Sequence, residues 1–476
     1  MTMPSTRPSG PKSVKTADAS QSPALSAAQQ QLQHQQAVQQ KVQASLAKRH
    51  TKEKLFRRLG FSAVLISLGL VAILFINIFS KGLPAFWQSS ITLDIYFDPA
   101  IVKVSDKPVK TATESEQAFQ QRSMQWQTEV GFINFNRLIT NSLKQVLPDA
   151  NKHRRELSRV VTSGERYALR DLVLANPDIV GQTRRLHLLT DANIDVWLKG
   201  NIDRSLPDEQ QQLSPVLQRW AEQLAKEGII QNRFSFALFM NPDSRSSLAS
   251  AGLAGAFMGS FYMLLVVILL AVPMGVAAAI YLEEFAPQNR FTDLVEVNIN
   301  NLAAVPSIVF GLLGASVLIG WFNLPMSAPI VGGIVLSLMT LPTVIIATRS
   351  TLKAIPPSIR QAALGLGASK MQAVFHHVLP LAIPGILTGA ILGVAQALGE
   401  TAPLLLIGMK SFVASVPATP FEQSTALPVQ IFLWQGNELR NFFEARTSAA
   451  IIVLLVMMLS LNGIAIFLRK KFQRNW

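Results

Sequence analysis

Long apolar runs constrain the fold of this chain more than any other feature of its sequence. Each is about 20 residues or longer, enough for a helix to cross the hydrocarbon core of a bilayer. Lipid offers no water to backbone N–H and C=O groups, so a span buries them by forming a helix. The sequence therefore predicts an all-α integral membrane protein with six transmembrane helices. The runs are Leu59–Ser80, Phe257–Leu282, Ile299–Phe322, Ala328–Thr348, Leu381–Met409 and Ala449–Leu468.

The distribution of charge predicts the orientation of these spans. The net charge of +14 alone is compatible with nucleic-acid binding. Residues 81–250, however, are nearly balanced, with 21 Lys and Arg against 19 Asp and Glu, whereas the rest of the chain has 22 against 10. This excess lies in tails and short loops beside apolar runs, which is typical of cytoplasmic segments. We therefore expect no nucleic-acid partner, both termini in the cytoplasm and residues 81–250 outside it.

These patterns divide the chain into five parts. The tail before the first span is rich in Gln, Ser and Pro and has too little apolar content to form a core. We expect a disordered, glutamine-rich cytoplasmic tail (1–56), a first transmembrane helix (57–80), an extracytoplasmic insert (81–250), a core with five transmembrane helices (251–468) and a basic cytoplasmic tail (469–476).

The insert between the first two spans is predicted to be an α+β domain. Capped amphipathic patterns near Glu165–Leu174, Asp191–Leu198 and Pro207–Lys226 predict helices, and the alternating run Phe234–Met240 favours a strand. The chain has no cysteine, so the insert must be held together by its own core. Its histidines are isolated, and no metal site is predicted. The sequence leaves its role open.

A polar hairpin lies between the fourth and fifth apolar runs, at residues 356–380. Gly367, at its centre, is the residue type that most readily ends a helix in the left-handed conformation. On both sides of it a Ser precedes a Gln by three residues, which predicts two capping boxes, at Ser358–Gln361 and Ser369–Gln372. Small apolar side chains share one face of the first helix: Ile359, Ala362, Ala363 and Leu366. We expect this hairpin to be a docking surface for a soluble partner.

The hairpin resembles the EAA loop of ABC importer permeases. The resemblance rests on Ala362, Ala363, Gly367, Leu379 and Pro380. It departs from the family pattern at Gln361, where glutamate is usual, and at His377, where an aliphatic residue is usual. In that family the loop lies in a cleft of the ATPase subunit and transmits its motion. The alternative is a helical hairpin that only links two spans.

Three further stretches are similar to phosphate ABC permeases of the PstA type. They are Ile280–Arg290 (IYLEEFAPQNR), Val297–Gly314 (VNINNLAAVPSIVFGLLG) and Ala397–Leu406 (ALGETAPLLL). The resemblance covers roughly residues 253–468 and implies the ABC importer permease fold in a bacterial inner membrane. It also implies four kinds of partner: inorganic phosphate, an extracytoplasmic phosphate-binding protein, two ATPase subunits and a second, related permease subunit.

The chain itself shows no means of using ATP. It contains no GxxxxGK[ST] phosphate-binding loop, and no HExxH or GxSxG motif. We therefore expect no catalytic residue, no cofactor and no metal in this chain, with ATP bound and hydrolysed by the partner ATPase.

Glu400 is the first candidate for the translocation path. An ionisable residue within a span is costly and usually functional, and Gly399 and Pro403 loosen the helix around it. A carboxylate repels an anion, so we expect Glu400 to pair with a cation or to titrate rather than to bind phosphate. In the family an arginine is frequent at the position of Gln396, so its partner is expected from another helix or subunit. A purely structural carboxylate remains the alternative.

Four other polar residues are candidates for the same path. Thr401 follows Glu400, and Ser307 and Thr343 adjoin prolines that interrupt helices. Arg349 ends the fourth run, where it can either face the path or serve as a positive-inside anchor. The Ser and Thr residues can equally be packing devices between helices.

Two other functions remain open on the sequence. The first keeps the class and changes the cargo to another oxyanion, such as sulfate or molybdate. The second is a membrane signalling scaffold in which the insert senses and the hairpin relays.

Overall fold

The computed structural model describes residues 23–472, apart from 112, 113, 148, 203, 206, 208, 209, 410 and 411. The chain divides between Phe75 and Ile76 into two units. The first is formed by most of one long helix, α1 (Pro23–Gly82), which includes the glutamine-rich tract. That tract was expected to be disordered, but the structure has it helical, because its many Gln and Ala residues are good helix formers. Residues 1–22 of the expected disordered tail lie outside the described residues.

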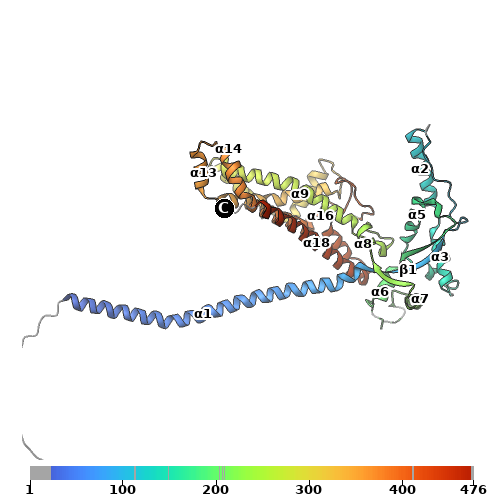
Figure 1. Cartoon of the computed structure of the whole chain (residues 1–476), viewed down its shortest axis with the longest axis horizontal. Helices are drawn as coiled ribbons and strands as arrows, with labels where there is room; N and C mark the ends of the chain where they lie inside the picture. The colour runs from blue at the N-terminus through green and yellow to red at the C-terminus, as the bar shows by residue number, and fades with distance from the viewer. Residues whose placement is uncertain are drawn as a thin grey trace, which may run out of the picture. The chain divides into compact units, whose positions relative to one another are not determined.

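The second unit begins with the insert, which combines a small sheet with short helices (Figure 1). Single 3₁₀ turns lie at Leu83–Phe86, Pro177–Ile179 and Leu248–Ser250. The strands are β1 (Trp87–Tyr96), β2 (Thr183–Leu189) and β3 (Ile230–Phe234). The helices are α2 (Glu116–Gly131), α3 (Phe135–Val146), α4 (Arg154–Leu157), α5 (Glu165–Ala175), α6 (Ala192–Leu198), α7 (Pro215–Lys226) and α8 (Ala237–Met240).

Strand β1 is the centre of the insert. It pairs antiparallel with both neighbours, in the order β2-β1-β3, with Ile91 opposite Leu188 and Ile230. Its side chains Ile91, Leu93 and Ile95 are fully buried. Helix α3 packs on this strand through positions spaced three and four apart, which is the spacing of an amphipathic helix. The insert thus forms a core without disulfides.

Two predictions for the insert are wrong in their boundaries. The run Phe234–Met240 is not one strand, because β3 ends at Phe234 and a helical turn, α8, follows. Directly after β3, the Ser235 backbone N–H donates to Phe86 O, at 2.7 Å. The helix expected from Pro207 begins only at Pro215, where a proline suits the first turn of a helix.

The remaining chain forms a helical bundle. Its helices are α9 (Ala254–Ile280), α10 (Arg290–Ala303), α11 (Ser307–Leu313), α12 (Pro329–Ala354), α13 (Pro357–Gly365), α14 (Lys370–Gln372), α15 (Leu379–Gly399), α16 (Ala402–Leu406), α17 (Leu427–Gln435) and α18 (Arg440–Phe472). Wider, π-helical turns lie at Tyr281–Phe285, Gly314–Ile319 and Ala373–Val378. Within this second unit the insert sheet lies beyond one end of α9 and α18, and α13 and α14 lie at the other end (Figure 1).

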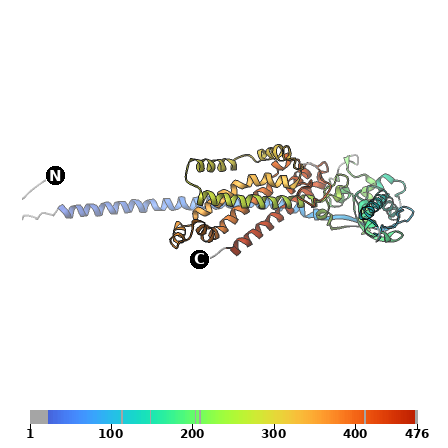
Figure 2. The ribbon, with the colours of Figure 1, turned by 90° about the horizontal axis from the view of Figure 1, so that it is seen from above.

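Five of the described helices are long and apolar enough to cross a membrane: α1, α9, α12, α15 and α18. Residues 290–303 and 307–319 pass the same test only as a pair, and they are bent by 100°. The predicted number of six spans therefore holds only if this bent pair is one span. Figure 2 shows α10 and α11 on one side of the bundle and α18 on the other.

Two predicted spans are interrupted, and proline explains both interruptions. The third run was expected to be one helix, but it breaks before Ser307, because Pro306 has no N–H and forces its predecessor out of the helical conformation. The fifth run was also expected to be continuous. Its helix α15 ends at Gly399, because Pro403 has no N–H to donate to the Gly399 carbonyl. Glu400, the next residue, is extended, with ψ 129°.

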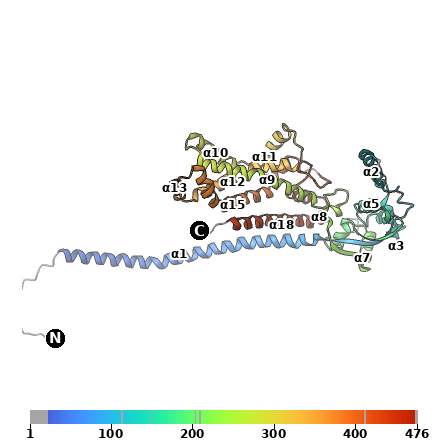
Figure 3. The same ribbon diagram turned by 45° about the horizontal axis from the view of Figure 1, so that its top comes forward.

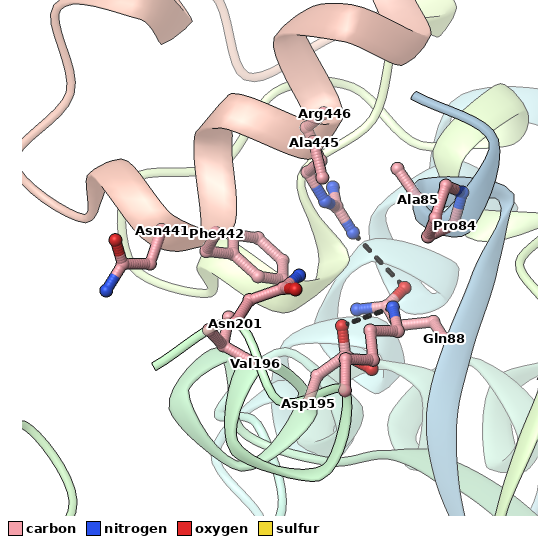
Figure 4. Close-up of a pocket in the computed structure, with 11 residues that line it drawn as sticks. Pro84, Ala85, Gln88, Asp195, Val196, Asn201, Asn441, Phe442, Ala445 and Arg446 are labelled. Carbon is pink, nitrogen blue, oxygen red and sulfur yellow. Dashed lines mark hydrogen bonds and ion pairs between the residues drawn. The ribbon is translucent and has the colours of Figure 1, made fainter. Parts of the chain in front are cut away.

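A buried arginine fastens the insert to the last helix. Arg446 of α18 is 2% exposed and stacks on Phe442. Its guanidinium donates to three acceptors at the base of the insert: Gln88 Oε1 at 3.1 Å, Ala249 O at 2.7 Å and Ala251 O. Figure 4 shows the bond to Gln88. A buried cation needs such acceptors to replace its lost hydration. The first residues of β1 and the end of the insert are thus fixed on α18.

We expect Arg446→Leu to destabilise the chain by roughly 2–4 kcal/mol, because it leaves buried oxygens without donors. The measurement is thermal unfolding of the purified protein, with Arg440→Leu as the control on an exposed position of the same helix. Equal melting temperatures for the two variants would show that the Arg446 contacts add nothing to stability.

Glu165 is an ionisable group buried inside the insert. It opens helix α5 and is 8% exposed. Burial raises the pKa of Glu165 to about 7, although a hydrogen bond from the Leu189 backbone opposes part of this effect. The folded chain therefore keeps this proton up to about pH 7, whereas an unfolded chain loses it near its ordinary pKa of 4.5. Stability contributed by Glu165 consequently falls as the pH rises from about 4.5 to about 7.

Glu165→Gln cannot titrate and keeps an oxygen for the Leu189 N–H. We expect this variant to be more stable than the wild type above pH 7, by roughly 2–3 kcal/mol, with the gain vanishing below pH 4.5. Thermal unfolding of both proteins between pH 4 and pH 8 measures it. A gain that is the same at every pH would contradict the titration of Glu165.

Candidate functional site

The hairpin between α12 and α15 turns at Gly367, as the sequence predicts. Gly367 has φ 87°, a conformation that side chains other than glycine rarely adopt. The second capping box is confirmed, with Ser369 Oγ accepting from Gln372 N at 3.3 Å and Gln372 Oε1 accepting from Ser369 N at 2.9 Å. The first box, from Ser358 to Gln361, is wrong. Helix α13 already begins at Pro357, so Ser358 lies inside it and cannot cap it.

An open groove of ≈ 900 Å³ runs along the apolar face of this hairpin. Ala363 is buried in its wall, whereas Leu366 is 91% exposed. An exposed leucine of this kind, in an open groove, is typical of a surface that a partner covers. Gln361 is exposed at the same helix, and Leu379 is half-buried against the bundle. The lining residues include Ile355, Ile359, Ala362, Ala363, Leu366, His376, His377 and Pro380.

Arg360 links the hairpin to the bundle, which the sequence did not predict. Its guanidinium holds the buried carboxylate of Glu284, with Nη2 at 2.5 Å from Oε1 and Nε at 3.2 Å from Oε2. It also donates to the carbonyls of Leu352 and Ile355, both at 2.9 Å, at the end of α12. The sequence signal was the pair of glutamates in the LEEF motif at the end of an apolar run.

Arg349 pairs with two carboxylates from other elements. Its Nη2 lies 3.0 Å from Glu296 of α10, and its Nε lies 3.3 Å from Glu283, which follows α9. Lys353 approaches Glu283 at 3.8 Å. Arg349 is half-buried, so these pairs replace part of its hydration. Its positive charge is thus largely balanced within this chain.

The two helix breaks lie on packed elements. Helix α11 contacts α16, and Gly311 allows the approach, because a Cβ there would lie 2.6 Å from Pro403 Cα. The breaks place Ser307 at the start of α11 and Glu400 and Thr401 before α16. All three side chains are partly exposed. The structure therefore brings together two interrupted helices, which sequence patterns alone treated as separate spans.

Glu400 lies in the break rather than within a helix, where the sequence predicted it. Its side chain makes no hydrogen bond or ion pair with any other residue that the structure describes. Among the described residues there is also no group of three or more His, Asp and Glu that could hold a metal ion. The apolar helix that is long enough to span a membrane ends at Gly399, so the break lies directly beyond it, where backbone groups and an unpaired carboxylate need water or polar partners. An unpaired carboxylate beside a backbone break is chemically suited to a water-filled path.

Thr343 and Arg349 lie elsewhere, on α12. This helix runs unbroken through Pro342, so the interruption expected beside Thr343 is wrong. Thr343 and Arg349 are six residues apart, or about 9 Å along the helix axis. Thr343 is half-buried, and its neighbour Val344 packs against Gly275 and Gly393. Figure 3 shows α10 near the end of the bundle that carries α13, with α11 farther toward the opposite end. The five candidate path residues thus fall into one group at the breaks and another along α12.

Two family models match the chain. One is described as "Binding-protein-dependent transport system inner membrane component" and matches residues 271–475. The other is described as "Domain of unknown function (DUF3333)" and matches residues 43–208.

Relatives and solved structures match about half of the chain. The "Probable ABC transporter permease protein YqgI" of Bacillus subtilis is 29% identical, over 52% of this chain and 88% of that protein. The "Phosphate transport system permease protein PstA" of Yersinia pestis is 32% identical, over 50% of this chain and 79% of that protein. A crystal structure of an amino acid ABC transporter matches 46% of this chain and 92% of its own, with 22% identity and a TM-score of 0.36.

Proposed function

Because this chain belongs to the inner membrane components of binding-protein-dependent ABC importers, as a permease of the PstA type, we propose that its cargo is inorganic phosphate. The family consists of transport subunits, not enzymes. The observation that carries the proposal is the similarity to relatives named phosphate transport permeases, which extends over 79% of the Yersinia pestis protein. The same name recurs for a relative from Mycobacterium leprae, at 32% identity.

The translocation path is proposed to pass the two helix breaks. Carbonyls freed at the breaks around Pro306 and Glu400 can accept hydrogen bonds from the water of a hydrated anion, and the hydroxyl groups of Ser307 and Thr401 can donate to the anion. Thr343 extends this polar lining along α12. The carboxylate of Glu400 repels phosphate, so it acts by pairing with a cation of the second permease subunit. Arg349 is engaged by two carboxylates and acts in positioning rather than in binding the anion.

ATP hydrolysis is proposed to reach this chain through the hairpin. Its groove, with Ala363 recessed and Leu366 exposed, fits a helix-in-cleft contact with an ATPase subunit. The ABC importer class implies ATPase and binding-protein partners. We infer that the complete importer has two ATPase subunits and a related second permease, with the hairpin and both termini in the cytoplasm. The insert, 81–250, then lies on the periplasmic side with the phosphate-binding protein.

Phosphate uptake by a deletion strain carrying this gene tests the cargo. We expect uptake of labelled phosphate that excess sulfate or molybdate does not reduce. Competition by either oxyanion at equal concentration would assign the importer to that anion instead.

We expect Gly367→Val to insert into the membrane normally but to lose its ATPase subunits. A β-branched residue at φ 87° distorts the turn, so the groove and the capped second helix separate. Gly365→Val is the control, because a Cβ at Gly365 meets no atom within 4 Å and its φ is not positive. The measurement is the ratio of ATPase to permease after purification. A normal ratio for Gly367→Val would remove the hairpin from the ATPase contact.

We expect Glu400→Gln to assemble normally and to lower phosphate uptake at least tenfold, which corresponds to about 1.4 kcal/mol. Gln keeps the size and hydrogen bonds of Glu and removes only its charge, so a partner arginine loses its counter-ion. Glu438→Gln, at an exposed position, serves as the control. Uptake by Glu400→Gln at the wild-type rate would mean that the carboxylate is structural.

A further inference from the structure

Two neighbouring carboxylates beyond the end of α9 are held by arginines from different elements. Glu283 and Glu284 lie in the wide turn Tyr281–Phe285. Consecutive residues of a helix point about 100° apart, so the two side chains reach different neighbours. Arg349 of α12 holds the first, and Arg360 of α13 holds the second.

We propose that these side chains form an ion-pair joint that passes movement of the hairpin to α10 and α11. The joint consists of Glu283, Glu284, Glu296, Arg349 and Arg360. Glu284 and Arg360 are then positioning residues for transport, acting far from the cargo. This inference rests on the proposed function for its purpose, although the joint itself is a property of this chain alone.

The first half of the joint connects the hairpin with α9 and α12. Arg360 bonds both oxygens of Glu284 and two carbonyls of the α12 end, so its donors are used on several sides. Glu284 is 8% exposed, which keeps water from competing for these bonds. A guanidinium fixed in this way resists rotation of α13 relative to α9, because its planar geometry is directional.

The second half connects α12 with α10. Arg349 bridges Glu283 and Glu296, so α10 is attached to the same wide turn that carries Glu284. Beyond Ala303 the chain bends by 100° into α11. That helix begins with Ser307 and contacts Pro403 through Gly311, next to the Glu400 break. Movement of the hairpin is thus linked by ion pairs to α10 and, through the chain itself, to α11, which lines the proposed path.

The other contacts of the hairpin are of a different kind. Apolar side chains such as Val374 and Val378 pack against Ile280 and Leu352, and Lys370 lies over the Phe285 ring at 5.6 Å. Apolar contacts permit sliding, since they have no preferred direction. Among the residues that the structure describes, Arg360 alone makes side-chain hydrogen bonds from segment 357–378 to the rest of the bundle. The directional part of the connection therefore passes through the joint.

A distance measurement on the full chain tests the joint without any transport. The chain has no cysteine, so Leu294→Cys of α10 and Met371→Cys of α14, both exposed, can carry spin labels specifically. In lipid nanodiscs we expect a narrow distribution of label distances. Glu284→Leu combined with Arg360→Met replaces the buried pair with apolar side chains, which commonly preserves folding. This pair should broaden the distribution at least twofold, whereas an unchanged width would overturn the proposal.

Two further variants separate the joint from general stability. Glu296→Gln removes only the ion pair between Arg349 and α10. The Glu296 side chain is half-exposed, so this variant should broaden the distance distribution without affecting folding. Arg360→Lys keeps the positive charge, so it should broaden the distance distribution less than Glu284→Leu/Arg360→Met does. Asp94→Asn combined with Arg185→Gln removes an exposed ion pair of the insert and should change nothing. Broadening by this control as well would show that the effect is not specific to the joint.

Transport by the reconstituted importer gives the functional readout. In Glu284→Leu/Arg360→Met we expect the ATPase to stay bound, while stimulation of ATP hydrolysis by the loaded binding protein and phosphate uptake both fall at least tenfold. Wild-type coupling in that variant would overturn the joint. If the wild-type importer itself carries no phosphate, the proposed cargo is wrong, and the label distances still decide the joint.

Discussion

Backbone hydrogen bonding in a surrounding without water is the constraint on which the bundle depends. Long helices satisfy it, and the chain departs from them at few places, notably around Pro306 and before Pro403. Each proline removes a donor that a continuous helix would need. The freed groups are tolerable only inside protein or beside water, and the two breaks pack against each other through Gly311. Backbone groups that lack a helical hydrogen-bond partner are thus gathered in one region of the bundle, beside Glu400.

Desolvation of charged side chains is the second constraint, and the chain meets it by placing hydrogen-bonding partners beside these side chains at the ends of helices. At one end, Arg349 and Arg360 take up Glu283, Glu284 and Glu296. At the other end, a single arginine of α18 bonds to acceptors from the base of the insert. The ion pairs of Arg349 and Arg360 contribute little net stability compared with apolar side chains, because desolvation offsets their attraction. We propose that their effect is to fix which elements move together.

These two features give the permease a simple division of labour. In our proposal the hairpin receives force from the ATPase, the joint fixes it to three helices, and the paired breaks offer a polar surface to the anion. The insert is attached to α18 by Arg446, so it extends the bundle rather than being tethered by its termini alone. An insert fixed in this way can present a partner to the bundle at a constant orientation.

The sequence by itself determined much of this protein. Apolar runs and flanking charges indicated a membrane protein with a capped hairpin, because span length and the turn at Gly367 depend on local chemistry. The step from there to a permease came from the resemblance of the hairpin and three further motifs to a known family. Local patterns also made Glu400, Thr401 and Ser307 candidates for the path, and this role stays a prediction. Sequence reasoning missed the arginine partners, since Glu284 and Arg360 lie 76 residues apart and only packing brings them together. Whether an interrupted apolar run bends was likewise decided by tertiary structure, because α10 and α11 keep their 100° bend through contacts with α12 and α16.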